Sequence, residues 1–538
     1  MSLDAGEAGD VVGGGLRDRE RVGGRIEGMG AFQSHGTSIT TPVAHPVVPK
    51  PPEPGTMGGM VFDFERTQRI AILGGGPGGY EAALAGAQLG ADVTLVEHTG
   101  VGGSAVLTDV VPSKTLIATA DAAQAIADAG ELGVQFYAKG DHDKPLKPEV
   151  AINLLAINKR LLALAGQQSE DMRTQLLEAG VKIISGHGRL EGDEAIVVST
   201  GPAGTDFDRI EADTIIVSVG ASPRELPSAK PDGKRILTWK HLYDLPAVPE
   251  HLIVVGSGVT GAEFASAYMN LGSKVTLVSS RDQVLPGEDQ DAAKVLEKVF
   301  TRGGMELLAK SRAESVENTG DGVRVTLSDG RVVEGSHCLM AVGAIPNTAD
   351  IGLEEAGVQV TPSGNIRINK VGRTSVPNVY AVGDCTTMMP LASVASMLGR
   401  TAVFHAMGDV AIPFDTHKIA ANIFTSPEIA TVGWTQPAVE EGTVSAEVHK
   451  LPLSSNARAK MMGVKDGFVK LYAREGSGTI VGGVIVAPRA SELIYPISIA
   501  VERRLTVDQV ARVFAAYPSL AGSITDAARA LHHVDRRS

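Results

Sequence analysis

Two glycine-rich loops, each between a predicted strand and a predicted helix, constrain the fold of this 538-residue chain more than any other feature. The first loop, residues 74–79, follows a buried-strand run at 69–73 and precedes a helix of small residues at 80–89 and a strand at 92–96. It fits G-x-G-x-x-G, whose glycines make the tight turn, admit a pyrophosphate to the backbone and pack the helix on the strand. Glu97 stands where an acid binds a ribose hydroxyl. This βαβ unit predicts dinucleotide binding.

The second loop, residues 256–261, repeats the pattern between a strand at 251–255 and a helix around 262–271. After the next strand, at 274–278, the chain carries the serines and arginine of 279–281 instead of an acid. An acid there would favour the ribose of NAD and repel a 2′-phosphate, so these residues leave room for NADPH. Two dinucleotide folds in one chain suggest two dinucleotides, a bound FAD and a visiting nicotinamide.

The remaining periodicity completes the expected architecture. A long amphipathic helix is predicted over 148–180, short strands over 182–219, and further strands at 324–327 and 338–341. From about residue 415 the pattern predicts strands near 419–433 and 466–487, then helices near 489–503, 506–514 and 519–531. The expected fold class is α/β, with two Rossmann-like dinucleotide-binding domains and a C-terminal α+β domain.

Composition and charge exclude several classes of protein. The chain has 62 acidic and 49 basic residues, a net charge of −13, which argues against a nucleic-acid binder. Its two cysteines, Cys338 and Cys385, exclude a disulfide-rich scaffold and a multi-cysteine zinc site, and we expect no metal. No apolar run is long enough for a membrane span, and no secretory signal is recognisable, so a cytoplasmic protein is expected.

Further motifs carry a family resemblance. They are Val101-Gly-Gly103 with Pro112-Ser-Lys114, the stretches 218–227 and 342–347, a strand ending in Gly383-Asp384, and Phe424–Gly433. With the two loops, they make residues 69–530 resemble the pyridine nucleotide–disulfide oxidoreductase family, the group of dihydrolipoamide dehydrogenase and glutathione reductase. The resemblance implies FAD, NAD(P)H and a homodimer, with the Asp384 carboxylate on the ribityl chain of FAD.

The resemblance also implies domain boundaries. Residues 1–65, rich in glycine and proline, are expected to form a disordered tail, because such a segment cannot bury enough apolar surface to offset its ordering entropy. The FAD-binding domain is expected in two parts, 66–222 and 345–412, around an NAD(P)-binding domain at 223–344. Residues 413–538 resemble the dimerisation domain of the family.

Departures from the family pattern bear on the function. The family has two redox cysteines in C-x4-C, and the corresponding positions here are Ala105 and Val110. The family also has a His-Pro pair with a Glu five residues after the His, and here these positions are Tyr517 and Gly522. Thiol–disulfide exchange requires a thiolate, so a disulfide substrate is not expected. Cys338 and Cys385 lie on other elements and are expected to be buried structural cysteines.

The reaction that remains is a transfer of electrons from a reduced flavin directly to a flat, partly apolar acceptor, which describes a quinone. The chain is most similar to the cysteine-less actinobacterial branch of NAD(P)H quinone reductases. The expected function is FAD-dependent NAD(P)H:quinone oxidoreduction. Two alternatives stay open: a soluble pyridine nucleotide transhydrogenase and a flavoprotein sensor with little turnover. A true lipoamide dehydrogenase is disfavoured by Ala105, Val110, Tyr517 and Gly522, so the chain would be like that enzyme in name only.

Three catalytic candidates follow from the resemblance. Lys114 resembles the family lysine near the flavin, and Glu263 resembles the glutamate that pairs with it, although a simple charge pair at a helix start is the alternative. Tyr517 is a candidate for hydrogen bonding to a quinone oxygen, or else a packed aromatic at a dimer interface. The residues expected to bind a cofactor are Gly74, Gly76, Gly79, Glu97, Gly103, Lys114, Gly188, Val219, Gly220, Ala221, Gly256, Gly258, Gly261, Glu263, Ser279, Arg281, Gly343, Asp384, Leu391, Ala392 and Ser393.

Overall fold

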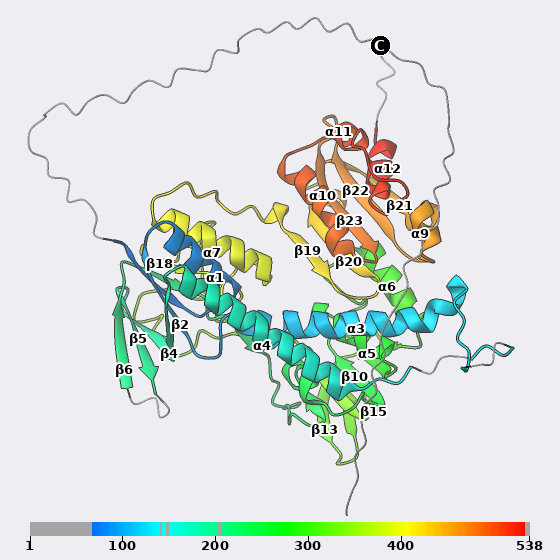
Figure 1. The fold of residues 1–538 in the computed structure, drawn as a ribbon, viewed down its shortest axis with the longest axis horizontal. Helices are drawn as coiled ribbons and strands as arrows, with labels where there is room; N and C mark the ends of the chain where they lie inside the picture. The colour runs from blue at the N-terminus through cyan, green and yellow to red at the C-terminus, as the bar shows by residue number, and fades with distance from the viewer. Residues whose placement is uncertain (1–66, 140–142, 147–149, 202–205, 533–538) are drawn as a thin grey trace, which may run out of the picture. The chain divides into compact units, whose positions relative to one another are not determined.

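The first glycine loop lies at the carboxyl edge of a parallel five-stranded sheet in a computed structural model, which describes residues 67–532 except 140–142, 147–149 and 202–205 (Figure 1). The predicted tail lies outside the described residues. The strand order is β18 (Val379–Ala381), β7 (Thr214–Val217), β1 (Arg69–Leu73), β2 (Asp92–Glu97) and β3 (Lys182–Ser185). Because β2 and β7 flank β1 on opposite sides, the order reverses at β1, and a crevice opens beyond its carboxyl end.

Helices α1 (Pro77–Gln88) and α7 (Ala392–Ala406) pack against each other beside this sheet (Figure 1). Glycines allow the close approach, since a Cβ on Gly399 of α7 would lie 2.2 Å from the Gly78 carbonyl oxygen of α1. The contact brings the start of α7, which comes late in the sequence, next to the first glycine loop.

The second glycine loop belongs to another parallel five-stranded sheet. Its order is β12 (Glu306–Leu308), β11 (Lys274–Val278), β10 (His251–Val255), β16 (His337–Met340) and β9 (Ile236–Leu237). Helix α5 (Val259–Asn270) follows β10 and packs on it and on β11. Both predicted βαβ units are therefore present, each with its loop after the central strand.

Three small antiparallel sheets accompany the parallel ones. One contains β4 (His187–Glu191), β5 (Ala195–Thr200) and β6 (Asp206–Glu211), and another contains β13 (Ala313–Asn318), β14 (Val323–Leu327) and β15 (Val332–Gly335). Strands β8 (Ala221–Pro223) and β17 (Ala344–Pro346) pair as a short ribbon. The ribbon pairs the segment that follows β7 of the first parallel sheet with the segment that follows β16 of the second.

Three α-helices lie between β2 and β3 in the sequence. They are α2 (Gly103–Leu107), α3 (Val110–Asp128) and α4 (Leu154–Glu178). Helices α3 and α4 run side by side, and α3 also contacts α5 (Figure 1). Within the described residues, no helix is both long enough and apolar enough to cross a membrane.

The C-terminal region is an antiparallel sheet with helices. The strand order is β19 (Ala420–Ile423), β20 (Glu428–Gly433), β23 (Ile480–Ala487), β22 (Phe468–Arg474) and β21 (Ala446–Pro452). Helix α10 (Ala490–Glu502) packs on β20 and β23, and α11 (Val507–Ala511) and α12 (Gly522–Ala530) pack against each other. The predicted α+β character is confirmed.

Helix boundaries differ from those that the sequence predicts. Helix α1 begins at Pro77 rather than residue 80, because proline is well tolerated where a helix starts. Helix α4 begins at Leu154 rather than residue 148, where the Asn153 side chain caps it by accepting the Ala156 N–H at 3.0 Å. Helix α12 begins at Gly522 rather than residue 519. Helices α2 and α3 were not predicted.

Candidate active site

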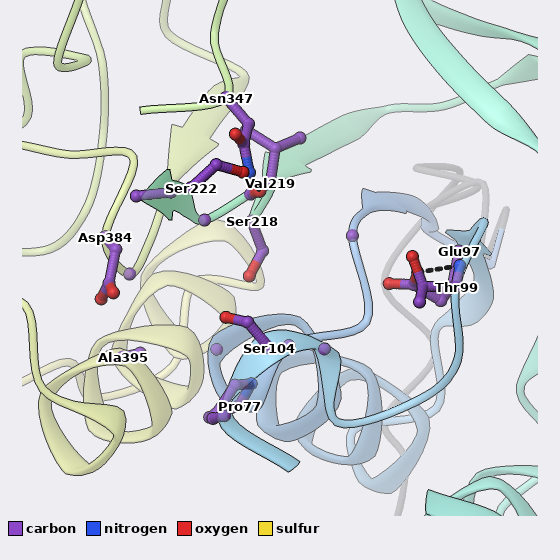
Figure 2. Close-up of a pocket in the computed structure, with 18 of the residues that line it drawn as sticks. Pro77, Glu97, Thr99, Ser104, Ser218, Val219, Ser222, Asn347, Asp384 and Ala395 are labelled. Atoms are coloured by element: carbon purple, nitrogen blue, oxygen red, sulfur yellow. Dashed lines mark hydrogen bonds between the residues drawn. The ribbon is translucent and has the colours of Figure 1, made fainter. Parts of the chain in front are cut away.

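A cavity of about 460 Å³ opens at the carboxyl end of β1. Its walls come from the first glycine loop, the end of β2, helix α2, the segment after β7 and the start of α7. Figure 2 shows Asp384 on one side of this space and Glu97 with Thr99 on the other, with Ser104 and Ser218 between them. The cavity is thus an elongated site with a carboxylate toward each end.

The glycine loop forms a cradle that side chains would fill. Gly74 has φ +101°, and a Cβ there would lie 2.3 Å from the Ser218 carbonyl oxygen. A Cβ on Gly103, which has φ +55°, would lie 3.0 Å from the Gly76 Cα. Helix α1 starts after Gly76 without a side-chain cap, so its first N–H groups face the cavity. Gly79 has a packing role instead, because a Cβ there would lie 2.0 Å from the Gly74 carbonyl oxygen.

Glu97 lies at one end of the cavity, held by the backbone. Its carboxylate accepts the Gly75 N–H at 2.7 Å, the Thr99 N–H at 2.6 Å and the Gly100 N–H at 3.3 Å. These bonds fix a buried acid at the end of β2, as the sequence predicts for a ribose-binding residue. His98, whose Nδ1 is 3.6 Å from the Glu97 carboxylate, also lines this end.

Asp384 lies toward the other end of the cavity, after β18. Burial raises the pKa of its carboxyl above the usual value. Ala392 at the start of α7 lines the wall beside it, whereas Leu391 and Ser393 lie outside the lining. Helix α7 therefore directs its N-terminus toward this end, as the sequence predicts.

Four more of the first-domain residues that the sequence analysis expects to bind a cofactor also line the cavity. Val219, Gly220 and Ala221 follow β7 and line the cavity. Gly188 in β4 also lines it, but close packing requires a glycine there too, since a Cβ would lie 2.6 Å from the Leu73 side chain. The glycine cradle, the exposed helix start and the two carboxylates together fit FAD.

The positions that correspond to the missing cysteines lie on the cavity wall. Ala105 in α2 and Val110 at the start of α3 both line the cavity, and Asp109 lies between the two helices. The two cysteines of the chain are elsewhere, free and fully buried. Burial raises the pKa of the Cys385 thiol to about 12 and that of the Cys338 thiol further, so both are inert thiols.

Lys114 and Glu263 form the ion pair expected from the resemblance. The Lys114 Nζ is 2.7 Å from the Glu263 Oε2, across α3 and α5. The other carboxylate oxygen of Glu263 accepts the Phe424 N–H at 2.8 Å, and the Lys114 Nζ lies 5.1 Å from the centre of the Phe424 ring. The pair lies beyond the cavity lining and ties together three segments that are distant in the sequence.

The second glycine loop lies outside this cavity and resembles the first in its backbone. Gly256 has φ +113°, and a Cβ on Gly261 would lie 1.8 Å from the Gly256 carbonyl oxygen, whereas the space around Gly258 is open. The hydroxyl of Ser279 lies 2.7 Å from that of Ser257, where the first domain has the Glu97 carboxylate. At the end of β11, two neutral serine side chains therefore take the place that the acid Glu97 has at the end of β2.

The other candidates of the second domain and the C-terminal candidate are exposed. Arg281 lies at the surface, and its carbonyl accepts the Lys310 N–H at 2.7 Å. Gly343, after β16, is exposed and has φ +96°. Tyr517 is 87% exposed and lies outside the lining of the cavity.

Sequence reasoning missed several lining residues. Ser218, Ser222, Asn347 and Asp109 belong to motifs that the sequence analysis recognises, so their positions could have been deduced; Lys240 gave no comparable signal, nor did the side chain of His187. Lys240 lies in a 3₁₀ turn, Trp239–Asp244, and the His187 ring lies 4.4 Å from that of His98. These are tertiary neighbours that spacing along the chain does not reveal.

Among the described residues, the Asp109 carboxyl has neither a hydrogen bond nor an ion pair. Burial raises its pKa to about 6, and the charges of Glu263 and Asp384 act in the same direction. Lys114 and Lys240 oppose this shift. The cavity therefore contains an unpaired carboxyl whose pKa is raised.

Comparisons with known proteins agree with this geometry. The family model described as pyridine nucleotide-disulphide oxidoreductase matches residues 68–399, and the model of its dimerisation domain matches residues 419–528. An NAD(P)H dehydrogenase (quinone) of Mycobacterium tuberculosis is 50% identical over 470 residues, which cover 86% of this chain and 94% of that protein. A dihydrolipoyl dehydrogenase 2 of Haloarcula marismortui is 32% identical over 475 residues, 88% of this chain and 98% of that protein.

Solved structures show the same fold. A crystal structure of LpdA from Mycobacterium tuberculosis matches with a TM-score of 0.81 and 48% identity, covering 87% of this chain and 100% of that one. The flavoprotein disulfide reductase RclA of Escherichia coli matches with a TM-score of 0.74 at 21% identity, covering 86% of this chain and 99% of that one. At that identity the second match concerns the fold alone.

Proposed function

The chain belongs to the pyridine nucleotide-disulphide oxidoreductase family, and from this premise we propose that it is an FAD-dependent NAD(P)H:quinone oxidoreductase. In this proposal NAD(P)H is oxidised at the second domain, and two electrons pass by way of FAD to a quinone without a redox disulfide. The relative from Mycobacterium tuberculosis bears the name of this activity.

One observation carries the proposal: Ala105 and Val110 line the FAD cavity where the family pattern has its cysteines. Neither side chain can form the thiolate that disulfide exchange needs. They leave an apolar wall, which suits a flat ring better than a charged or peptide substrate. The two buried thiols, Cys338 and Cys385, are too enclosed to replace the dithiol.

The residues of the cavity divide the binding of FAD among them. Gly74, Gly76 and the free N–H groups at the start of α1 would hold the pyrophosphate, and Glu97 a ribose hydroxyl. Asp384 would bind the ribityl chain. When bound, FAD supplies the capacity to accept a hydride from a nicotinamide and to pass on two electrons. Lys114, fixed by its pair with Glu263, would be the nearby cation that stabilises negative charge.

We propose that the second domain accepts NADPH as well as NADH. The neutral Ser257–Ser279 pair would not repel a 2′-phosphate, and Arg281 is exposed next to it. Arg281→Ala should raise KM for NADPH about tenfold, which is a loss of about 1.4 kcal/mol, and leave KM for NADH unchanged. Steady-state kinetics with both nucleotides measure this, and an equal effect on both would contradict the assignment.

We also propose a homodimer, because the dimerisation-domain model matches residues 419–528. The exposed Tyr517 would then lie at the partner subunit and could donate a hydrogen bond to a quinone oxygen. Sedimentation of the FAD-loaded protein tests the dimer. Tyr517→Phe removes only the hydroxyl. If that hydroxyl binds the quinone, the variant should still form a dimer and should have a higher KM for quinone.

The decisive experiment compares acceptors. The FAD-loaded protein is mixed with NADPH and either menadione or lipoamide, before and after treatment with iodoacetamide. We expect rapid NADPH oxidation with menadione, unchanged by the alkylating agent, and none with lipoamide. Turnover with lipoamide would reveal a thiol relay and overturn the proposal.

A further inference from the structure

An unused carboxyl lies in the cavity beside the proposed acceptor site. Asp109 joins α2 to α3: its N–H donates to the Ser104 carbonyl at 2.8 Å, and its carbonyl accepts the Ser113 N–H at 2.7 Å. Aspartate at the N-cap of a helix usually caps it with the side chain. Here the side chain makes no such bond, although the backbone is fixed on both sides, and Asp109 lines the cavity. The fold therefore holds a free carboxyl at a fixed place in the site.

The apolar wall lies next to this group. Ala105 and Val110 line the cavity on either side of Asp109 in the sequence, so a ring against them would lie near the carboxyl. The two lysines whose charges act on the Asp109 carboxyl form no ion pair with it. Lys114 lies beyond the cavity lining, paired with Glu263 at 2.7 Å, and among the described lining residues Lys240 is the lysine.

Burial and the surrounding charges raise the pKa of the Asp109 carboxyl to about 6. Its charged and polar neighbours come from three other places, which are Glu263 on α5, Asp384 after β18, and Lys240 with Tyr243 in the 3₁₀ turn; Lys114 lies on the helix that Asp109 begins. The two carboxylates disfavour its ionisation and the two lysines favour it, while burial disfavours it most. A general acid works best when its pKa lies near the operating pH.

We propose that Asp109 is the general acid that protonates the quinone oxygen during reduction. This inference rests on the proposed function. Reduction of a quinone to a quinol consumes one hydride equivalent and one proton. The hydride equivalent comes from NAD(P)H, which leaves as NAD(P)⁺, by way of FAD. The Asp109 carboxyl donates the proton to the quinone oxygen as the C=O bond becomes C–O–H, and the carboxylate then regains a proton from water.

Stopped-flow kinetics of the two half-reactions test the role of Asp109. In Asp109→Asn, reduction of the flavin by NADPH should keep its rate within about twofold, while reoxidation by menadione should slow by about 10²-fold. In the wild type, reoxidation should slow as the pH rises through about 6, because the protonated acid is consumed. The variant should lose this pH dependence, and Asp109→Glu, which retains an acid, should keep it.

A direct readout of the proton is independent of turnover. Infrared difference spectra of the FAD-loaded protein should show protonated carboxyl intensity that titrates near pH 6, and Asp109→Asn should lose the part of it that is not lost in Asp121→Asn. Asp121→Asn is the matched control: Asp121 lies on the same helix, its pKa is also raised to about 6, and it lies outside the cavity lining. It should leave both half-reactions unchanged.

The outcomes separate the two proposals. If the wild type does not reduce menadione, the proposed function fails. If the wild type reduces it and Asp109→Asn does so at the same rate with the same pH profile, only the role of Asp109 is overturned. Loss of reoxidation in Asp121→Asn as well would also overturn it, because the effect would then not belong to the cavity.

Discussion

At the scale of single residues, Asp109 links the site to the stability of the protein. Because its pKa in the folded state is raised from 3.8 to about 6, the ionised carboxylate opposes folding, fully above pH 6 and not at all below about pH 4. Asp109→Asn should therefore raise the free energy of unfolding by about 1–3 kcal/mol at pH 8 and leave it unchanged at pH 4. Urea unfolding at the two pH values measures the difference, and an equal gain at both would contradict this origin.

The Lys114–Glu263 pair is expected to stabilise the fold, whereas the ionised Asp109 carboxylate opposes folding. Lys114→Gln would leave a carboxylate that is only 5% exposed without its cation, so we expect a loss of about 2 kcal/mol in the free energy of unfolding. Lys298→Gln is the matched control, because the Lys298 side chain is 69% exposed and its partner Asp466 keeps a second cation, Arg302, at 2.6 Å. That pair should contribute less than about 1 kcal/mol. Similar losses in the two variants would mean that leaving Glu263 without any cation costs no more than removing one of the two cations of Asp466.

At the scale of secondary-structure elements, the junction of β1 and α1 should tolerate no added carbon atom. Gly79→Ala would place a Cβ 2.0 Å from the Gly74 carbonyl oxygen, so the loop must shift and FAD binding should fall. In Gly166→Ala, on the exposed side of α4, the added Cβ meets open space and should stabilise the helix by up to about 1 kcal/mol. Flavin absorbance of the purified proteins measures occupancy, and a fully loaded Gly79→Ala would contradict the cradle.

The parallel strands were the elements that the sequence predicted best. The predicted bounds of β1, β10 and β11 coincide with the structure, because each is a short apolar run ended by glycine or a polar residue. Helix α3 was missed. Its start carries the β-branched Val110 and Val111 and then Pro112, which look unlike a helix although proline is tolerated in a first turn.

The site itself could be predicted only where a motif marks it. Glu97 and Asp384 follow predictable strands, and both line the cavity. Asp109 is one residue between two helices, and no periodicity identifies it. Its significance depends on burial and on charges that come from three other segments, which are tertiary facts. The roles assigned to the individual residues, and the domain boundaries, stay predictions.

At the scale of the whole molecule, a buried charge joins the second parallel sheet unit to the C-terminal sheet. Lys470 of β22 is only 2% exposed and lies 2.7 Å from Asp289, which caps α6 (Gln290–Arg302). The Tyr472 hydroxyl donates to the same carboxylate at 3.1 Å. Lys470→Met should cost about 3–5 kcal/mol in the free energy of unfolding, because Asp289 is left buried without its cation.

A double-mutant cycle tests this connection. Lys470→Met combined with Asp289→Asn should recover part of the loss, since the second change removes the unpaired charge. Urea unfolding of the four proteins measures the coupling between the two side chains. Additive losses would show that the two regions are held together by their other contacts.

The cysteine-free cavity wall has a chemical consequence beyond electron transfer. Quinones are electrophiles, and a thiolate near a bound quinone is prone to attack it and become arylated. With Ala105 and Val110 at the wall, and Cys338 and Cys385 fully buried with raised pKa values, this chain presents no such nucleophile to its proposed acceptor. The protein should therefore resist arylation at sulfur by a quinone bound in this cavity.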